Sequence, residues 1–144
     1  MEIDNIQDRI IDEFEEYSDK SHRFKYFRRL VQIGSELAPI KATEMNKENL
    51  VVGGKSKIWL KARLENGKVF FTAHSKNLIS KGLVGLLLKV FSGRSPKEII
   101  NSNLYFLNEI NLYDRLNPEW LKDLLSVMQK IKSLAIGLQV NTSA

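Results

Sequence analysis

Residues 51–60, VVGGKSKIWL, place a Gly-Gly pair directly before Lys55 and Ser56, the residue types that end a phosphate-binding loop. Such a loop has the form G-x-x-x-x-G-K-[ST] and leads into a helix, whose N-terminus receives the phosphate. Here Asn49 stands where the first glycine belongs, and residues 57–64 alternate between polar and apolar side chains as a strand does. The sequence therefore predicts a loop between two strands and excludes this kind of nucleotide site.

The chain of 144 residues contains no cysteine, which excludes disulfides, cysteine-ligated zinc, iron–sulfur ligation and thiol chemistry on this protein. Its two histidines, His22 and His74, are too few and too isolated to indicate a metal site. The sequence has no G-x-S-x-G or H-E-x-x-H motif, and no pair of carboxylates at a useful spacing. We therefore expect no metal, no cofactor and no enzyme activity.

The charges of the chain are unevenly distributed around a net charge of +5. Residues 1–20 hold eight acids against Arg9 and Lys20, whereas the remaining 124 residues hold 20 bases against 9 acids. We expect an acidic N-terminal helix over residues 1–18, which either lies against the basic body or helps to select a partner. Because the bases are scattered and accompany no recognition motif, we do not expect a nucleic-acid partner.

No segment has the pattern of a membrane-spanning helix or of a secretory signal peptide. The longest apolar run, residues 83–88, is too short to span a bilayer. The N-terminus begins with Glu2 and Asp4 and lacks the basic and apolar stretches of a signal peptide. We therefore expect a cytoplasmic protein without a membrane partner.

The pattern of apolar residues predicts a single α+β domain over residues 1–144. Residues 50–52, 57–64 and 68–73 are expected to form a three-stranded antiparallel sheet, with Asn66-Gly67 as the hairpin turn between the last two strands. Helical spacing is found in residues 24–37, 78–90 and 103–110. We expect the helices to pack on one face of the sheet.

Two short motifs mark the beginnings of later helices. Ser95-Pro96-Lys97-Glu98 is a capping box with proline at the first helical position. Asn117-Pro118 opens the last helix by the same chemistry, and Gly137 is expected to cap that helix. Residues 138–144 are then expected to form a frayed tail.

Four segments of the chain carry further motifs. They are FRRLVQIGSELAP at residues 27–39, VGGKSKIW at 52–59, ISKGLV at 79–84 and FSGRSPKEII at 91–100. In order and spacing they resemble the x-L-G-x-x-L-P, V-x-G-C-Q-S-x-V-W, I-V-K-G-L and Y-S-G-R-T-P-x-E-I-L motifs of SufE and its paralogue CsdE. This family accepts sulfur from cysteine desulfurases in iron–sulfur cluster assembly. The resemblance covers residues 20–135 and implies a SufE-like fold.

The same resemblance shows where this chain departs from the family. The family's acceptor cysteine, which takes a persulfide from the desulfurase, corresponds to Gly54. Ser56 matches the family's serine, but a hydroxyl cannot replace a thiolate in this exchange. The family's D-S-D reads His74-Ser75-Lys76, and in the last helix Trp120 stands in place of Arg and Asp123 in place of Gly. These changes imply that the chemistry of one pocket is lost or altered.

Two interpretations remain open. In the first, the chain still binds a cysteine desulfurase of the SufS or CsdA type but cannot accept persulfide, which makes it a regulatory or degenerate homologue. The residues expected to bind this partner are the loop residues Gly53, Gly54, Lys55 and Ser56 and the pocket neighbours His74, Ser75, Lys76, Trp120 and Asp123.

In the second interpretation, the SufE-like scaffold is a binding module for an anionic partner. The basic side chains expected near the loop would attract such a partner; they are Lys55, Lys57, His74, Lys76 and Lys81. Successive glycine N–H groups would add an anion nest. An ordinary solvated surface is the simpler account of the same lysines.

Overall fold

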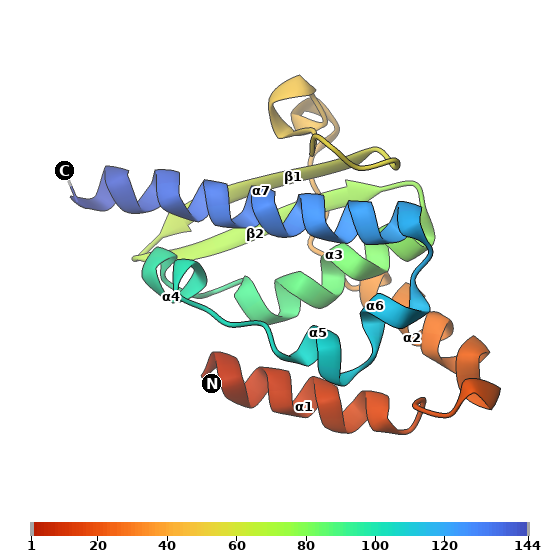
Figure 1. The fold of residues 1–144 in the computed structure, drawn as a ribbon. Helices are drawn as coiled ribbons and strands as arrows, with labels where there is room; N and C mark the ends of the chain where they lie inside the picture. Colours follow the sequence, from red (N-terminus) through yellow and green to blue (C-terminus); the bar gives the residue numbers. More distant parts are fainter. Residues whose placement is uncertain (1, 144) are drawn as a thin grey trace.

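The computed structural model describes residues 2–143, with side chains described for residues 2–19 and 21–140. The helices are α1 (Ile3–Glu15), α2 (Arg23–Ser35), α3 (Leu78–Phe91), α4 (Pro96–Ile100), α5 (Phe106–Glu109), α6 (Leu112–Arg115) and α7 (Pro118–Ser143), and the strands are β1 (Ile58–Glu65) and β2 (Lys68–Ser75). In Figure 1, α3 lies between the β-hairpin and α1, and α7 runs along the hairpin. The predicted α+β class is confirmed.

The hairpin of β1 and β2 turns at Asn66 and Gly67, as the sequence predicts. Both residues have positive φ angles, 52° and 77°, which the Asn-Gly pair adopts readily in a tight hairpin turn. The antiparallel ladder runs from the pair Ile58↔Ser75 to the pair Glu65↔Lys68. Because side chains alternate across a strand, one face of the hairpin is buried in the core, whereas the other is half-exposed.

The expected third strand is reduced to an isolated bridge, so the sheet of the described residues has two strands rather than three. Leu50 pairs with Trp59, and the N–H group of Val51 donates to the carbonyl of Ile58 at 2.8 Å. Val52 then points outward with 86% of its surface exposed, and Gly53 has a φ angle of +107°. This left-handed backbone turns the chain away from β1 before a ladder can form.

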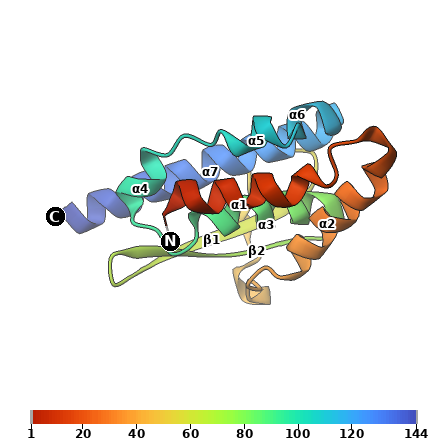
Figure 2. The same ribbon diagram turned by 90° about the horizontal axis from the view of Figure 1, so that it is seen from below.

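Helix α3 is the centre of the domain and is buried on nearly all sides. It crosses α2 at close range, because a Cβ atom on Gly82 would stand 2.3 Å from the carbonyl oxygen of Leu30. Its other contacts reach β2, α7 and α1, and the view from below shows α1 passing across it (Figure 2). An apolar helix without a wide polar face suits this central position.

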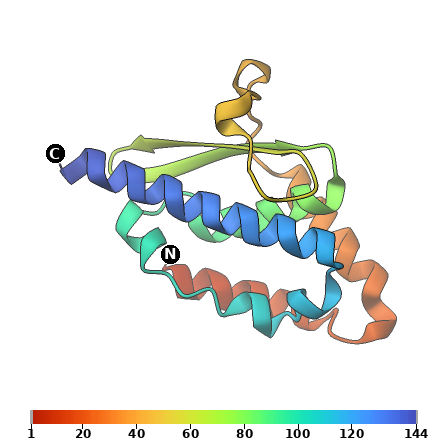
Figure 3. The same ribbon diagram turned by 45° about the horizontal axis from the view of Figure 1, so that its top comes forward.

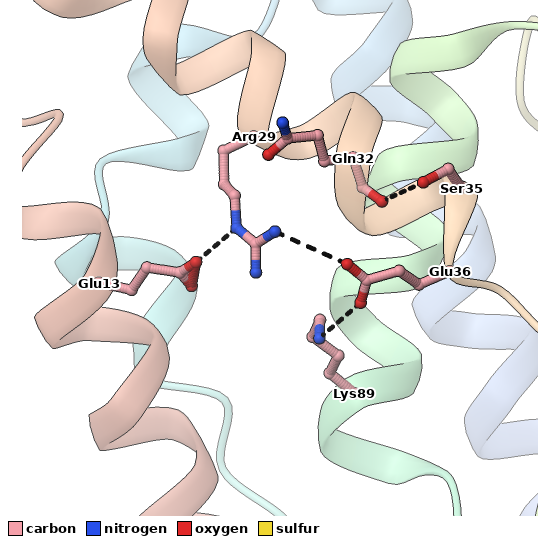
Figure 4. A network of polar contacts seen from close by, with 6 residues as sticks. All are labelled: Glu13, Arg29, Gln32, Ser35, Glu36 and Lys89. Atoms are coloured by element: carbon pink, nitrogen blue, oxygen red, sulfur yellow. Dashed lines mark hydrogen bonds and ion pairs between the residues drawn. The ribbon is translucent and has the colours of Figure 1, made fainter.

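The acidic helix α1 ends at Glu15, so it is shorter than the expected 1–18, and it lies against the body. Ile10 and Phe14 are buried in the common core. Figure 4 shows the polar contacts at its edge, where Arg29 of α2 pairs with Glu13 and lies 3.7 Å from Glu36. Lys89 of α3 pairs with Glu36 at 3.3 Å, so one chain of charges joins three helices.

The last helix begins at Pro118 as predicted but does not end at Gly137. Helix α7 continues to Ser143 and passes along the hairpin, with its last turns extending past the hairpin turn (Figure 3). The expected frayed tail over residues 138–144 is therefore helical as far as the described residues reach, and Ala144 lies outside them. Leu134 and Leu138 pack on the core on either side of Gly137, which stabilises the helix through that position.

The capping box of α4 is confirmed. Ser95 Oγ accepts the N–H of Glu98, and the Glu98 carboxylate accepts the N–H of Ser95, both at 3.1 Å. The stretch 103–110 is less regular than predicted, since only α5 is helical within it. Asn111, whose φ angle is +57°, then precedes the separate helix α6. Among residues 2–143, none of the helices combines the length and the hydropathy that a bilayer crossing requires.

Candidate functional site

The loop that precedes β1 is bound to α7 through the carboxylate of Asp123. The backbone N–H groups of Lys55 and Ser56 both donate to Asp123 Oδ1, at 2.7 and 3.1 Å. The hydroxyl of Ser80 donates to Asp123 Oδ2 at 2.8 Å and lies 3.0 Å from the hydroxyl of Ser56. Asp123 and Ser80 are almost completely buried, so this network is sealed from solvent on the side of the core.

The two glycines of the loop lie directly against α7. A Cβ atom on Gly53 would stand 3.0 Å from Ser126 Oγ, and one on Gly54 would stand 2.3 Å from Asp123 Oδ1. Asp123 and Ser126 are three residues apart on α7 and so share one face of that helix. The positive φ angle explains the glycine at position 53, and the close approach of the carboxylate explains the glycine at position 54.

Three elements place these groups. The bridge of Leu50 to Trp59 closes the base of the loop at the start of β1. Asn77 caps α3 by accepting the N–H groups of Ile79 and Ser80, at 3.1 and 3.0 Å, which fixes Ser80 in the first turn of that helix. Helix α7 supplies Asp123 from the opposite side, so the carboxylate joins the loop to both helices.

The predicted pocket neighbours do not all meet at the loop. Asp123 is hydrogen-bonded to it, whereas His74 lies on the half-exposed face of the hairpin and stacks on Trp59, with ring centroids 6.4 Å apart. Trp120 packs against Phe27 of α2, with ring centroids 5.8 Å apart. The remaining two predicted neighbours are Ser75, which is buried and accepts a hydrogen bond from the N–H of Asn77, and Lys76, which is exposed.

Ser80 and Ser126 also belong to the site, although neither was predicted from the sequence. Ser80 occupies a fully buried position in a helix whose other buried residues are apolar or glycine. A polar residue on the buried face of an apolar helix needs a partner, and this was the available signal. Ser126 gives no comparable signal, because serine is common on half-exposed helix faces.

The outer surface of the loop is basic and contains one apolar side chain. Lys55, Lys57 and Lys76 are exposed, and none of them pairs with a carboxylate in the part of the chain that the structure describes. Val52 is the most exposed large apolar residue of that part. The N–H groups of Lys55 and Ser56 point the other way, to Asp123, so only side chains are presented outward.

A hollow of about 510 Å³ lies elsewhere, between the end of α1 and α6. It is lined by Ser18, Arg23, Asn111, Asp114 and Arg115. The guanidinium of Arg115 already donates to the carbonyls of Tyr17 and Ser18 and stacks on the ring of Tyr26. These contacts hold the end of α1 against α6.

The site lacks an activated nucleophile, a general base beside it and a group of metal ligands among the described residues. Position 54 carries no side chain, and the chain has no thiol. The hydroxyls of Ser56 and Ser80 are bound to each other, and that of Ser80 is also bound to the carboxylate of Asp123, with no histidine beside them to act as a base. Within the described residues, no three His, Cys, Asp or Glu side chains come together as a metal-binding group.

The fold and the loop before β1 define a protein of the SufE class. The chain has the fold of a solved hypothetical protein from Thermus thermophilus, with a TM-score of 0.74, 17% sequence identity and coverage of 94% of this chain and 96% of that one. The chain also matches the SufE family, described as an Fe-S metabolism associated domain, over residues 8–135. It therefore belongs to the SufE family, and it contains no cysteine that could serve as an acceptor.

Individual relatives carry the same family name. An uncharacterized SufE-like protein from Synechocystis is 27% identical over 135 residues, which span 94% of this chain and 83% of that protein. An uncharacterized SufE-like protein from Rhizobium meliloti is 30% identical over 135 residues, 90% of this chain and 94% of that protein. A chloroplastic and mitochondrial SufE-like protein 1 from Arabidopsis thaliana is 30% identical over 115 residues, but these make up only 31% of that longer protein.

Proposed function

We propose that this chain binds a cysteine desulfurase without accepting sulfur from it, and so acts as a regulatory or degenerate member of the sulfur-mobilising SufE family. The proposal rests on one observation about the loop that corresponds to the family's acceptor loop. The loop is retained and well packed, yet the space that a side chain at Gly54 needs is filled by the carboxylate of Asp123. The family's work with cysteine desulfurases supports the choice of partner.

Loss of sulfur transfer follows from the chemistry of the residues. A thiolate is the group that attacks a persulfide and carries its sulfur away, and this chain has none. The hydroxyl of Ser56, which is nearest to the acceptor position in sequence, is bound to Ser80 inside the site. It is therefore neither the right nucleophile nor presented to a partner.

Loss of one thiol does not require loss of docking, because binding free energy resides in a few buried anchors across an interface. Val52, which is 86% exposed, is the apolar side chain of the loop that such a contact would bury. Lys55 and Lys57 beside it would favour a partner with carboxylates around the contact. His74 and Lys76 stand where the family has two carboxylates, so we expect the choice among desulfurases to differ from that of an active family member.

The first test is a calorimetric titration of the chain into the cysteine desulfurase of the same organism. We expect binding with a dissociation constant in the micromolar range, roughly 8 kcal/mol of binding free energy. After incubation with cysteine, intact mass measurement should detect no added sulfur on this chain. The proposal fails if no heat of binding is measured with any desulfurase of that organism.

Two variants test separately the effects of the missing thiol and of the missing space at position 54. Gly54→Cys alone restores the thiol but places its Cβ against Asp123. Gly54→Cys combined with Asp123→Gly also restores the space, so we expect the double variant to accept sulfur more readily than the single one. Ser133→Cys, on the exposed side of α7, is the control for a thiol outside the loop and should accept little.

A second candidate function is supported by the exposed lysines of the loop. If the partner is a different acidic protein, Lys55, Lys57 and Lys76 supply the attraction through their side chains, since the backbone N–H groups are taken by Asp123. A poly-glutamate peptide would then bind in low salt, and Lys55→Gln with Lys57→Gln would weaken this binding. No heat with the desulfurase together with this result would favour the second function.

A further inference from the structure

We infer that residues 53–56 and Ser80 form an anion-binding site, and that the chain fills this site with its own ligand, the carboxylate of Asp123. This internal ligand latches the loop to α3 and α7 and closes its backbone donors to outside groups. The inference goes beyond the proposed function and does not depend on it, because it concerns contacts within the chain.

The donors of the site converge on one carboxylate from two separate segments. The consecutive N–H groups of Lys55 and Ser56 form a small nest around Asp123 Oδ1, at 2.7 and 3.1 Å. The hydroxyl of Ser80 serves the other oxygen at 2.8 Å. Ser80 is fully buried, so this donor is part of a built site rather than a surface group.

The charge of the ligand is balanced by these donors and not by a cation. Asp123 is 1% exposed, and it forms no ion pair with Lys, Arg or His in the part of the chain that the structure describes. A buried carboxylate is costly unless hydrogen-bond donors replace its water. The nest and Ser80 supply them, as they would for an oxyanion from outside.

The shape of the site couples residue 54 to residue 123. Asp123 Oδ1 reaches the nest only because Gly54 lacks a Cβ, which would stand 2.3 Å from that oxygen. A side chain at 54 and a carboxylate at 123 therefore exclude each other. Any anionic group of a partner reaches the N–H groups of Lys55 and Ser56 only after Asp123 has moved away.

Chemical rescue tests this inference directly. Asp123→Ala removes the carboxylate and keeps a good helix former in α7, and formate has the size of the missing group. We expect 0.2 M sodium formate to raise the melting temperature of this variant by about 3 °C over sodium chloride of equal ionic strength. The native chain, whose site is already full, should show a difference near zero.

Gln7→Ala is the matched control. Gln7 is also fully buried and bonds to the carbonyl of Asn103 and the N–H of Phe106, but its site is not built for an anion. Formate should not rescue it. Equal effects of formate and chloride on Asp123→Ala, or equal formate effects on all three proteins, would overturn the inference.

Hydrogen exchange on the native chain keeps the inference testable if Asp123→Ala does not fold. The amide protons of Lys55 and Ser56 belong to a surface loop, yet they donate to a buried carboxylate. We expect them to exchange on the order of 100-fold more slowly than free amides of the same sequence. Exchange at the free rate would show that the latch is not closed, and it would do so without reference to any desulfurase.

Discussion

Asp123 Oδ1 lies 2.3 Å from the point where a Cβ atom of residue 54 would stand, well inside the contact distance of two heavy atoms. The carboxylate cannot swing aside cheaply, because it would lose the N–H groups of Lys55 and Ser56 while it stays buried. A side chain at position 54 is thus excluded by a carboxylate that its hydrogen bonds hold in place, not by the mobile end of a flexible side chain.

The first prediction concerns this exclusion. Gly54→Ala should destabilise the native chain by about 2 kcal/mol, because the new methyl group displaces the carboxylate of Asp123. In an Asp123→Ala background the same change should cost at least about 1 kcal/mol less, since the clash with the carboxylate is gone and only the 3.3 Å approach to the Cα atom of residue 123 remains. Urea unfolding of the four proteins measures the coupling, and additive free energies would show that residues 54 and 123 are independent.

The sequence identified both partners of this contact but not the contact itself. Gly54 and Asp123 were each singled out because they depart from the family's residues. That they touch depends on how α7 lies on the loop, which no local pattern encodes. His74 and Trp120 were grouped with them for the same reason and lie in other contacts, with Trp59 and with Phe27.

At the scale of elements, the turns and the beginnings of helices were predicted from local sequence. The end of α7 was not, because tertiary packing outweighs the local signal there. Asn66-Gly67 and the Ser95 capping box depend on neighbours in sequence and were predicted correctly. Gly137 failed as a stop signal because it faces open space on α7, where glycine costs only about 1 kcal/mol against alanine. Flanking leucines that pack on the core outweigh that loss.

Helix α2 shows that the spacing of apolar residues does not always predict which side chains are buried. The helical spacing of residues 24–37 begins with Phe24, yet Phe24 is 72% exposed, with the guanidinium of Arg28 over its ring at 4.7 Å. Tyr26 is buried instead, because its hydroxyl finds the carbonyl of Ile110 at 2.9 Å. Burial also raises the pKa of the Tyr26 hydroxyl. A partner from a distant segment thus decided which aromatic residue faces the core.

The capping box gives a pH-dependent prediction. The N–H group of Ser95 bonds to the Glu98 carboxylate and lowers its pKa below the ordinary 4.5. A lowered folded-state pKa stabilises the fold above the ordinary value, and this gain is lost as the pH falls through the folded value. Glu98→Gln should therefore lose less stability than the native chain between about pH 5 and pH 3. Parallel curves of melting temperature against pH would contradict this.

Lys132 links two helices and gives an independent prediction at this scale. Its ammonium group, carried by α7, donates to the carbonyls of Ile99, Ile100 and Ser102 at the end of α4. Lys132→Met keeps an unbranched apolar side chain but removes the donor to these carbonyls, together with the ammonium that lies 5.7 Å from the centroid of the Phe91 ring. We expect a loss of about 1–3 kcal/mol in urea unfolding, with Lys130→Met as the control. A loss as small as that of the control would mean that water serves these carbonyls equally well.

For the whole molecule, the question is what holds the acidic helix α1 on a basic body. Charges suggest one answer, since Glu13 pairs with Arg29 and the network continues to Glu36 and Lys89 (Figure 4). Packing suggests another, because Phe14 is 2% exposed and lies edge-on to the ring of Tyr26 at 5.1 Å. The magnitudes of the two effects decide between these answers.

Partly exposed ion pairs contribute about 1 kcal/mol or less, whereas truncation of a buried phenylalanine costs about 3–5 kcal/mol. We therefore expect Phe14→Ala to destabilise the chain several times more than Arg29→Gln in urea unfolding. Sodium chloride at 0.5 M should shrink the effect of Arg29→Gln and leave that of Phe14→Ala unchanged, because salt screens charges but not packing. If Arg29→Gln proved the more damaging change in low salt, charge pairing rather than the core would hold α1 on the body.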